Sequence, residues 1–151
     1  MVTLAKACVI ADKALEKGRI LNLHPLSVAV LDASGCLVVF KREDHSALLR
    51  EQIAQAKAWG ALGLGIGGRG LAQRAASAPS FFNAISALSG GRIIPVPGGV
   101  LIRAKDRSLL GAVGVSGDLP DHDEACAIHG IELAGFLSDT GAPADPAVPA
   151  R

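Results

Sequence analysis

Two neighbouring runs, Gly98-Gly-Val-Leu-Ile-Arg103 and Ser108-Leu-Leu-Gly-Ala-Val-Gly-Val115, decide the fold. Both are rich in aliphatic residues that favour strands, and only Ala104-Lys-Asp-Arg107 separates them. A connection this short predicts that the two strands pair as an antiparallel hairpin. A second hairpin is predicted upstream, where Leu26-Ser-Val-Ala-Val-Leu31 and Cys36-Leu-Val-Val-Phe-Lys41 flank a four-residue turn that ends in a glycine.

Helices are predicted before, between and after the hairpins, because apolar residues recur there at helical spacing. The predicted helices run over 3–17, from about 47 to near 63, over 71–77, from 79 onward, and from 121 to near 138. Gly18 follows basic residues and is expected to end the first helix. Asp121 and Glu124 are expected to form a capping box that opens the last helix.

The remaining strand is expected at the edge of the sheet. Arg92-Ile-Ile-Pro-Val-Pro97 reads as extended chain, and its prolines suit only an edge position. The sequence thus predicts an α+β fold, a five-stranded, largely antiparallel sheet packed with helices in a single domain over residues 1–138. Residues 139–151 are rich in Pro and Ala and are predicted to form a flexible C-terminal tail.

Composition excludes several classes of protein. Half of the 151 residues are hydrophobic but only 3% are aromatic, and 15 basic residues balance 14 acidic ones without forming a basic stripe, which argues against nucleic-acid binding. The apolar runs are too short for a membrane helix or a signal peptide. Three widely spaced cysteines without a Cys-x-x-Cys pair indicate reduced thiols, so we expect a cytoplasmic protein.

Six short motifs follow one another along the chain: Val28-Ala-Val-Leu-Asp-Ala-Ser-Gly-Cys-Leu-Val38, Arg42-Glu-Asp44, Ala54-Gln-Ala-Lys-Ala58, Gly98-Gly-Val-Leu-Ile102, Gly114-Val-Ser-Gly117 and His122-Asp-Glu-Ala-Cys-Ala127. Together they resemble the GlcG/HbpS-like family, also called the haem-degrading domain family. The resemblance covers nearly the whole chain, to Phe136. It implies a homo-oligomer, commonly built from dimers, in a family that includes haem- or cobalamin-associated binders and proteins encoded with catabolic pathways for small organic acids.

The sequence departs from the family pattern at three positions. His45 stands where the family usually has Gly, Leu101 replaces the usual Pro, and His122 stands where Gln is common. Either histidine is a candidate haem iron ligand or proton-transferring base. Neighbouring acids would favour the protonated form of His122, although a solvated helix start explains that residue equally well.

Cationic side chains and glycines are the candidate binding residues for an anion. Arg42 follows a strand and could hold a carboxylate with its planar guanidinium, unless it pairs with its acidic neighbours. Lys57 could reach a pocket from a helix face of small residues, or simply lie at the surface. Gly98 and Gly99 border the expected site, and the turn from Gly114 to Gly117 leads to a helix N-terminus whose N–H groups attract anions, unless those glycines only turn the chain.

Two further patterns are weaker. Gly65-Ile-Gly-Gly-Arg-Gly70 fits the dinucleotide-binding string, but a helix precedes it where that site needs a strand, so a flexible or tightly packed loop is expected. His122, Cys126 and His129 share one helical stripe whose spacing permits a metal or haem ligand, although a buried cysteine beside a hydrogen-bonded histidine is commoner. No firm metal site is predicted.

Two functions follow, and whether the protein is an enzyme stays open. The first is a small-molecule binding protein of the haem-degrading family type, which holds haem or a related carboxylate-bearing compound with Arg42 and Lys57 and uses His45 or His122 as a possible iron ligand. The alternative is a cofactor-independent isomerase or tautomerase of a small organic carboxylate, in which a histidine moves a proton and Glu124 orients it. A weaker third possibility is an accessory oligomer without chemistry of its own.

Overall fold

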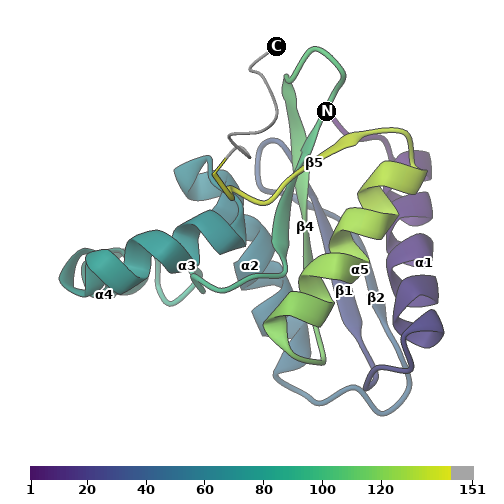
Figure 1. Cartoon of the computed structure of the whole chain (residues 1–151), viewed down its shortest axis with the longest axis horizontal. Helices are drawn as coiled ribbons and strands as arrows, with labels where there is room; N and C mark the ends of the chain where they lie inside the picture. The colour runs from purple at the N-terminus through teal and green to yellow at the C-terminus, as the bar shows by residue number, and fades with distance from the viewer. Residues whose placement is uncertain (144–151) are drawn as a thin grey trace.

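Five antiparallel strands form one sheet in the order β2-β1-β4-β3-β5, in a computed structural model that describes residues 1–143 (Figure 1). The strands are β1 (Ser27–Asp32), β2 (Leu37–Arg42), β3 (Gly99–Arg103), β4 (Leu109–Ser116) and β5 (Leu137–Asp139). The helices are α1 (Leu4–Ile20), α2 (Arg50–Leu64), α3 (Gly68–Ser77), α4 (Pro79–Leu88) and α5 (Pro120–Leu133). The predicted α+β class and both predicted hairpins are confirmed.

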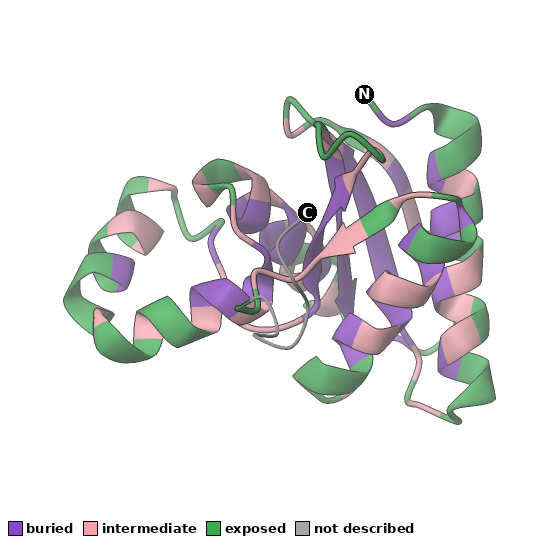
Figure 2. Ribbon diagram, turned by 45° about the horizontal axis from the view of Figure 1, so that its top comes forward, coloured by how far each residue is buried: buried purple, intermediate pink, exposed green. Residues whose placement is uncertain are grey.

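Helices cover both faces of the sheet. Val28 and Val30 of β1 pack into a core shared with α1 and α5, whereas Leu31 packs against α2 on the other face. This alternation follows from the two-residue period of a strand. The central strands are buried, while α3 and α4 extend away from the sheet with mostly exposed surfaces (Figure 2).

The fifth strand was predicted in the wrong place. Arg92–Pro97 forms no strand, and β5 pairs with the outer edge of β3 instead, with Ile102 opposite Ser138. Two prolines deprive the 92–97 segment of ladder donors, which explains its irregular path. The last helix ends at Leu133 rather than near residue 138, and Gly135, with φ of +91°, turns the chain into β5.

Gly18 was predicted to end the first helix, and this prediction is wrong. It lies buried inside α1, which runs on to Ile20. A Cβ at this position would lie 2.5 Å from Cδ1 of Leu26, so the glycine serves close packing of α1 against the start of β1. Thr3 caps the other end of α1 by accepting a hydrogen bond from the N–H of Lys6 at 3.3 Å.

The glycine-rich stretch is tightly packed rather than open. Gly65 ends α2 with φ of +69°, and α3 begins at Gly68, three residues later. A Cβ at Gly67 or Gly70 would overlap the backbone of residues 139–141. The helix before this stretch is confirmed, so the geometry of a dinucleotide fingerprint is absent from it.

The predicted capping box at the start of α5 is wrong. The helix begins at Pro120, so the N-cap is Leu119, whose side chain has no acceptor, and Asp121 already lies inside the helix. Arg69 binds the carboxylates of Asp121 and Glu124. Asp123 takes part in the turn instead, and its Oδ1 accepts the N–H of Asp118 at 3.0 Å.

At the C-terminal end, β5 includes Asp139, where the flexible tail was expected to begin. Most of that expected tail, residues 144–151, lies outside the described residues. Among residues 1–143, no helix combines the length and the apolar character needed to cross a membrane.

Candidate functional site

One end of the sheet gathers most of the candidate residues. β1 begins there, β2 and β4 end there, and α2 and α5 start just beyond it, at the bottom of the view in Figure 1. Ser27 lies opposite Arg42 in one neighbouring strand and opposite Ser116 in the other, so these three positions follow one row across the sheet. The motifs around residues 42 and 117, far apart in the sequence, are therefore brought to one edge.

Arg42 stabilises the loop that follows β2. Its Nε and Nη2 donate hydrogen bonds to the carbonyl of Ser46 at 3.1 and 2.7 Å. Ser46 is buried, with its Oγ 2.8 Å from Oγ of Ser27, whereas His45 is exposed with φ of +69°. Beside this loop lies an open depression of about 420 Å³, lined by Arg19, Pro25, Arg42, Glu43 and Asp44.

His122 is held by Asp118. The two side chains meet at 2.7 Å between Nδ1 and Oδ1, and Oδ2 of Asp118 accepts the N–H of His24 at 2.9 Å. The hydrogen bond from His122, with help from the backbone N–H of His24, keeps the pKa of Asp118 well below its usual range. Nε2 of His122 has no hydrogen-bond partner among residues 1–143, and the side chain is 48% exposed. Asp118, and not Glu124 as expected, therefore orients this imidazole.

Lys57 is buried in an ion pair and is not a surface lysine. Its Nζ donates to Oδ2 of Asp123 and to the carbonyl of Val115, each at 3.0 Å. Gly98, with φ of +114°, leaves room for the amine, since a Cβ there would lie 2.8 Å from Nζ. Exclusion of water lowers the pKa of Lys57 and raises the pKa of Asp123, despite their attraction.

These contacts separate Arg42 from Lys57. The guanidinium of Arg42 is bound to its own loop beyond the end of β2, and the amine of Lys57 is bound beside the start of β3. β1 and β4 lie between those strands, so the structure does not bring the two expected anion partners together.

Glu124 is the partner of Arg69. Nε of Arg69 lies 2.9 Å from Oε1 of Glu124, its Nη2 lies 2.8 Å from the same oxygen, and Nη2 also reaches Oδ1 of Asp121 at 2.6 Å. The hydrogen bonds that Arg69 donates to these carboxylates, first to Glu124 and then to Asp121, raise its pKa. Sequence reasoning missed Arg69, because 55 residues separate it from Glu124 and only the fold brings the two side chains together.

The four candidate glycines let backbones approach. A Cβ at Gly99 or Gly114 would overlap the carbonyl of Lys57 or Ala54 in α2, and one at Gly117 would overlap the carbonyl of Pro25. Gly98, as described above, makes room for a side chain. These four glycines therefore serve the close packing of the chain against itself.

The stripe of His122, Cys126 and His129 forms no metal site. Cys126 is fully buried, and its burial raises the pKa of the thiol to about 12, which disfavours the thiolate that a metal needs. Nε2 of His129 is buried without a partner in the described part of the chain. No group of three His, Cys, Asp or Glu side chains among residues 1–143 could hold a metal ion.

A family model matches most of this fold. The model of the family described as haem degrading protein HbpS-like matches residues 2–132, from the start of α1 to the end of α5. The chain belongs to this family. No curated protein matches the chain of this HbpS-like protein.

Solved structures share the fold of this HbpS-like chain. A crystal structure of HbpS has a TM-score of 0.76 at 29% identity and covers 89% of this chain and 90% of that one. Protein ORFY of Klebsiella pneumoniae has a TM-score of 0.77 at 26% identity, with 88% and 90% covered. The PduOC:haem complex has a TM-score of 0.80 with 89% and 96% covered, but its 22% identity supports only the shared fold.

Proposed function

We propose that this HbpS-like chain binds haem or a related carboxylate-bearing small molecule at the sheet end that carries His122. The observation that carries the proposal is the 2.7 Å contact between Nδ1 of His122 and Asp118, on a side chain that is 48% exposed and whose Nε2 has no partner among residues 1–143. A histidine that donates one ring nitrogen to a carboxylate and presents the other is the usual arrangement of a metal ligand. The family description and a haem complex of the same fold support this choice of ligand.

The side chains at this end fit a haem group in three respects. His122 offers a nitrogen for the iron, and Leu119, 64% exposed in the turn before α5, offers apolar surface for a ring. Arg19 and Arg42 line the neighbouring depression, where a carboxylate of the ligand would replace their present partners, Glu43 at 2.9 Å from Arg19 and the carbonyl of Ser46 at 2.7 Å from Arg42. Bound haem would supply an iron centre, and these residues would hold and orient it.

His122 is a better candidate ligand than His45. The ring of His122 is already oriented by Asp118, so binding would cost little side-chain entropy. The side chain of His45 has no hydrogen-bond partner among residues 1–143. Lys57 is left out of the proposed site, because its amine is committed to Asp123.

Haemin titration followed by absorbance tests the proposal. We expect a new Soret band with the wild-type protein, the same band with His45→Ala, and loss or a shift of the band with His122→Ala. Asp118→Asn should weaken binding by about 10- to 100-fold, the usual effect of losing such a carboxylate. Absence of a new Soret band beyond that of free haemin, or an unchanged band in the double variant His45→Ala/His122→Ala, would show that histidine-ligated haem binding is wrong.

The isomerase alternative is not carried forward. In that alternative, Glu124 orients the histidine that moves the proton. The structure instead binds the carboxylate of Glu124 to Arg69. The comparisons lend this alternative no support.

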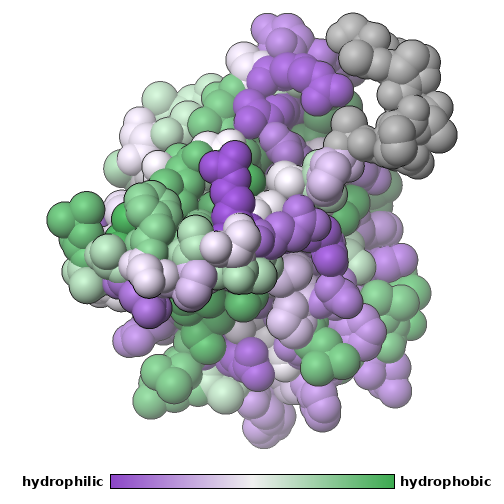
Figure 3. Space-filling model, turned by 60° about the vertical axis from the view of Figure 1, so that its left-hand side comes forward, coloured by the Kyte–Doolittle hydropathy of each residue, from purple (hydrophilic) through white to green (hydrophobic). Residues whose placement is uncertain are grey.

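We further propose that the protein is a homo-oligomer built from dimers, with α4 in the contact. This helix carries no charged residue, yet it leaves Phe81 55% and Leu88 87% exposed. Figure 3 brings this side forward and shows hydrophobic residues gathered on it. A second copy would cover them. Light scattering should give a smaller mass for Phe81→Ser/Leu88→Ser than for the control Leu4→Ser, whose leucine is 63% exposed on α1; an equal mass contradicts this contact.

We also propose a location in the cytoplasm and a single domain that runs through β5 and the packed backbone of residues 139–141. The free thiols of Cys8, Cys36 and Cys126 support the first proposal, since such thiols persist in reducing compartments.

A further inference from the structure

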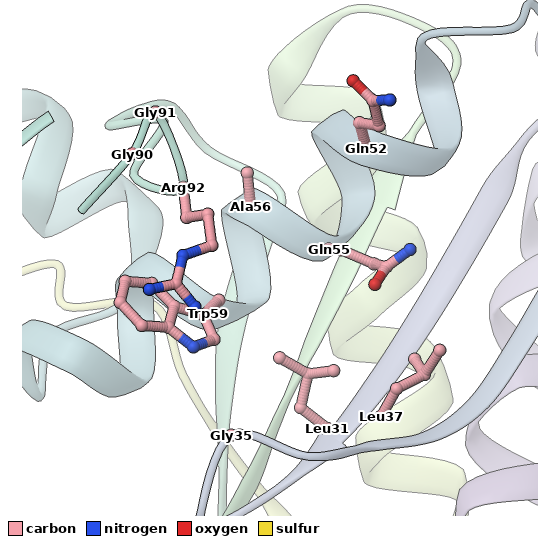
Figure 4. Close-up of a pocket in the computed structure, with 10 residues that line it drawn as sticks. All are labelled: Leu31, Gly35, Leu37, Gln52, Gln55, Ala56, Trp59, Gly90, Gly91 and Arg92. Carbon is pink, nitrogen blue, oxygen red and sulfur yellow. The ribbon is translucent and has the colours of Figure 1, made fainter. Parts of the chain in front are cut away.

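A second cavity lies away from the His122 end, on the outer side of α2. It has a volume of about 410 Å³ and is lined by Leu31, Gly35, Leu37, Gln52, Gln55, Ala56, Trp59, Gly90, Gly91 and Arg92. Its volume falls within the range of small-molecule sites. Figure 4 shows Trp59 and Arg92 on one side of this cavity and Leu31 and Leu37 on the other.

Arg92 is held in place while its outer nitrogens stay available. Its guanidinium carbon lies 4.0 Å from the centre of the Trp59 ring, and its Nε donates to the carbonyl of Ser89 at 2.9 Å. Neither Nη atom has a hydrogen-bond partner among residues 1–143. A planar guanidinium fixed at one edge presents these two nitrogens as a fork that fits a carboxylate.

The other lining residues complete such a site. Gln52 and Gln55 lie one helical turn apart on α2, and their carboxamides form no hydrogen bond within the described residues. Leu31 and Leu37 supply an apolar wall, and Arg92 is the one charged residue of the lining. The lining thus combines an unopposed cation and amide donors with apolar surface.

The same lining excludes haem as the occupant. It contains no histidine, cysteine or methionine, so it offers no side chain of the kinds that usually ligate haem iron. We propose that this cavity binds a small aromatic carboxylate, with the carboxylate on Arg92 and the glutamines and the ring between Trp59 and the two leucines. This site is independent of the haem proposal.

The single tryptophan reports directly on this site. Trp59 is the only Trp in a chain without Tyr, so its fluorescence changes when a ligand reaches the cavity. Benzoate is the probe. Benzamide is the control that keeps the ring but lacks the charge, and acetate is the control that keeps the carboxylate but lacks the ring. We expect saturable quenching or enhancement by benzoate, confirmed by calorimetry, and at least about tenfold weaker binding of the other two compounds.

Variants separate this site from the other one. Arg92→Gln should weaken benzoate binding by about tenfold or more, whereas Arg107→Gln, in the exposed β3–β4 turn, should not change it. His122→Ala should still bind benzoate, and Arg92→Gln should still give the wild-type result with haemin. Equal affinity for benzoate and benzamide, or equal affinity of wild type and Arg92→Gln with both proteins folded by circular dichroism, overturns the proposal.

Discussion

The ammonium of Lys57 lies 3.0 Å from Oδ2 of Asp123, and both side chains are almost completely buried. The lysine comes from α2 and the aspartate from α5, the helices that cover opposite faces of the sheet. They meet beside the start of β3, where Gly98 leaves the necessary space. The ion pair therefore joins the two helical layers beside the start of β3.

Removing one partner of this pair should destabilise the protein strongly. Lys57→Met leaves Asp123 buried without its counter-charge, and the free energy of unfolding should fall by about 3–5 kcal/mol in urea titrations followed by circular dichroism. The control is Lys13→Met, which breaks the exposed pair with Glu16 and should cost less than about 1 kcal/mol. Equal losses in the two variants would contradict this account. The double variant Lys57→Met/Asp123→Leu should lose less than the sum of the single changes.

Local pattern was sufficient for most of the fold. Runs of β-branched and other aliphatic residues joined by short turns identified both hairpins, because such signals lie within a dozen residues of one another. The fifth strand could not be found this way, since the three residues of β5 owe their conformation to the free edge of β3. Gly18 was misread for a similar reason, because its close contact is with Leu26 and not with its own helix end.

The candidate site was less accessible to sequence reasoning. Lys57 and Asp123 are 66 residues apart, and Arg69 and Glu124 are 55 apart, so no spacing rule links them. Asp118 and His122 are only four residues apart, but Asp118 lies before α5, and the helical spacing rule pairs residues of one helix. Their contact depends on the turn that leads into α5.

Close packing of α2 on β4 should make Gly114 intolerant of a methyl group. A Cβ at this position would overlap the carbonyl of Ala54, so Gly114→Ala should lower stability by about 1–3 kcal/mol or more. In Gly63→Ala the new Cβ meets only Cζ3 of Trp59 at 3.8 Å, and the loss of backbone freedom in the unfolded chain should raise stability slightly. Thermal unfolding measures both. A rise in Tm for Gly114→Ala would show that the backbone of α2 shifts at little cost to make room for the methyl group.

The lowered pKa of Asp118 predicts a specific acid sensitivity. The unfolded carboxyl, with an ordinary pKa of 3.8, takes up a proton before the folded one does. Its contribution to stability is therefore complete above this pKa and is lost as the pH falls through lower values. The free energy of unfolding of the wild type should fall as the pH is lowered. In Asp118→Asn the slope of this fall should be smaller, by at most about 1.4 kcal/mol per pH unit.

Urea unfolding at pH 3 to 6 measures this effect. Asp44→Asn is a suitable control, because Asp44 is exposed and its carboxylate forms no hydrogen bond within the described residues. The control should keep the wild-type slope. An Asp118→Asn variant with that same slope would mean that the contact with His122 does not persist in solution.

The fork of Arg69 should be irreplaceable by lysine. One guanidinium binds Glu124 through two nitrogens and Asp121 through one of them, and it thereby ties α3 to the start of α5. A lysine ammonium keeps the charge but lacks the planar pair of donors, so Arg69→Lys should lose about 1–3 kcal/mol of stability. Arg74→Lys, on the same helix and exposed, should stay within about 0.5 kcal/mol of wild type. Hydrogen exchange adds a local readout, since the amides of α3 should exchange faster in Arg69→Lys alone. If both variants exchange alike, α3 is held by its glycine contacts with the 139–141 backbone and not by this ion pair.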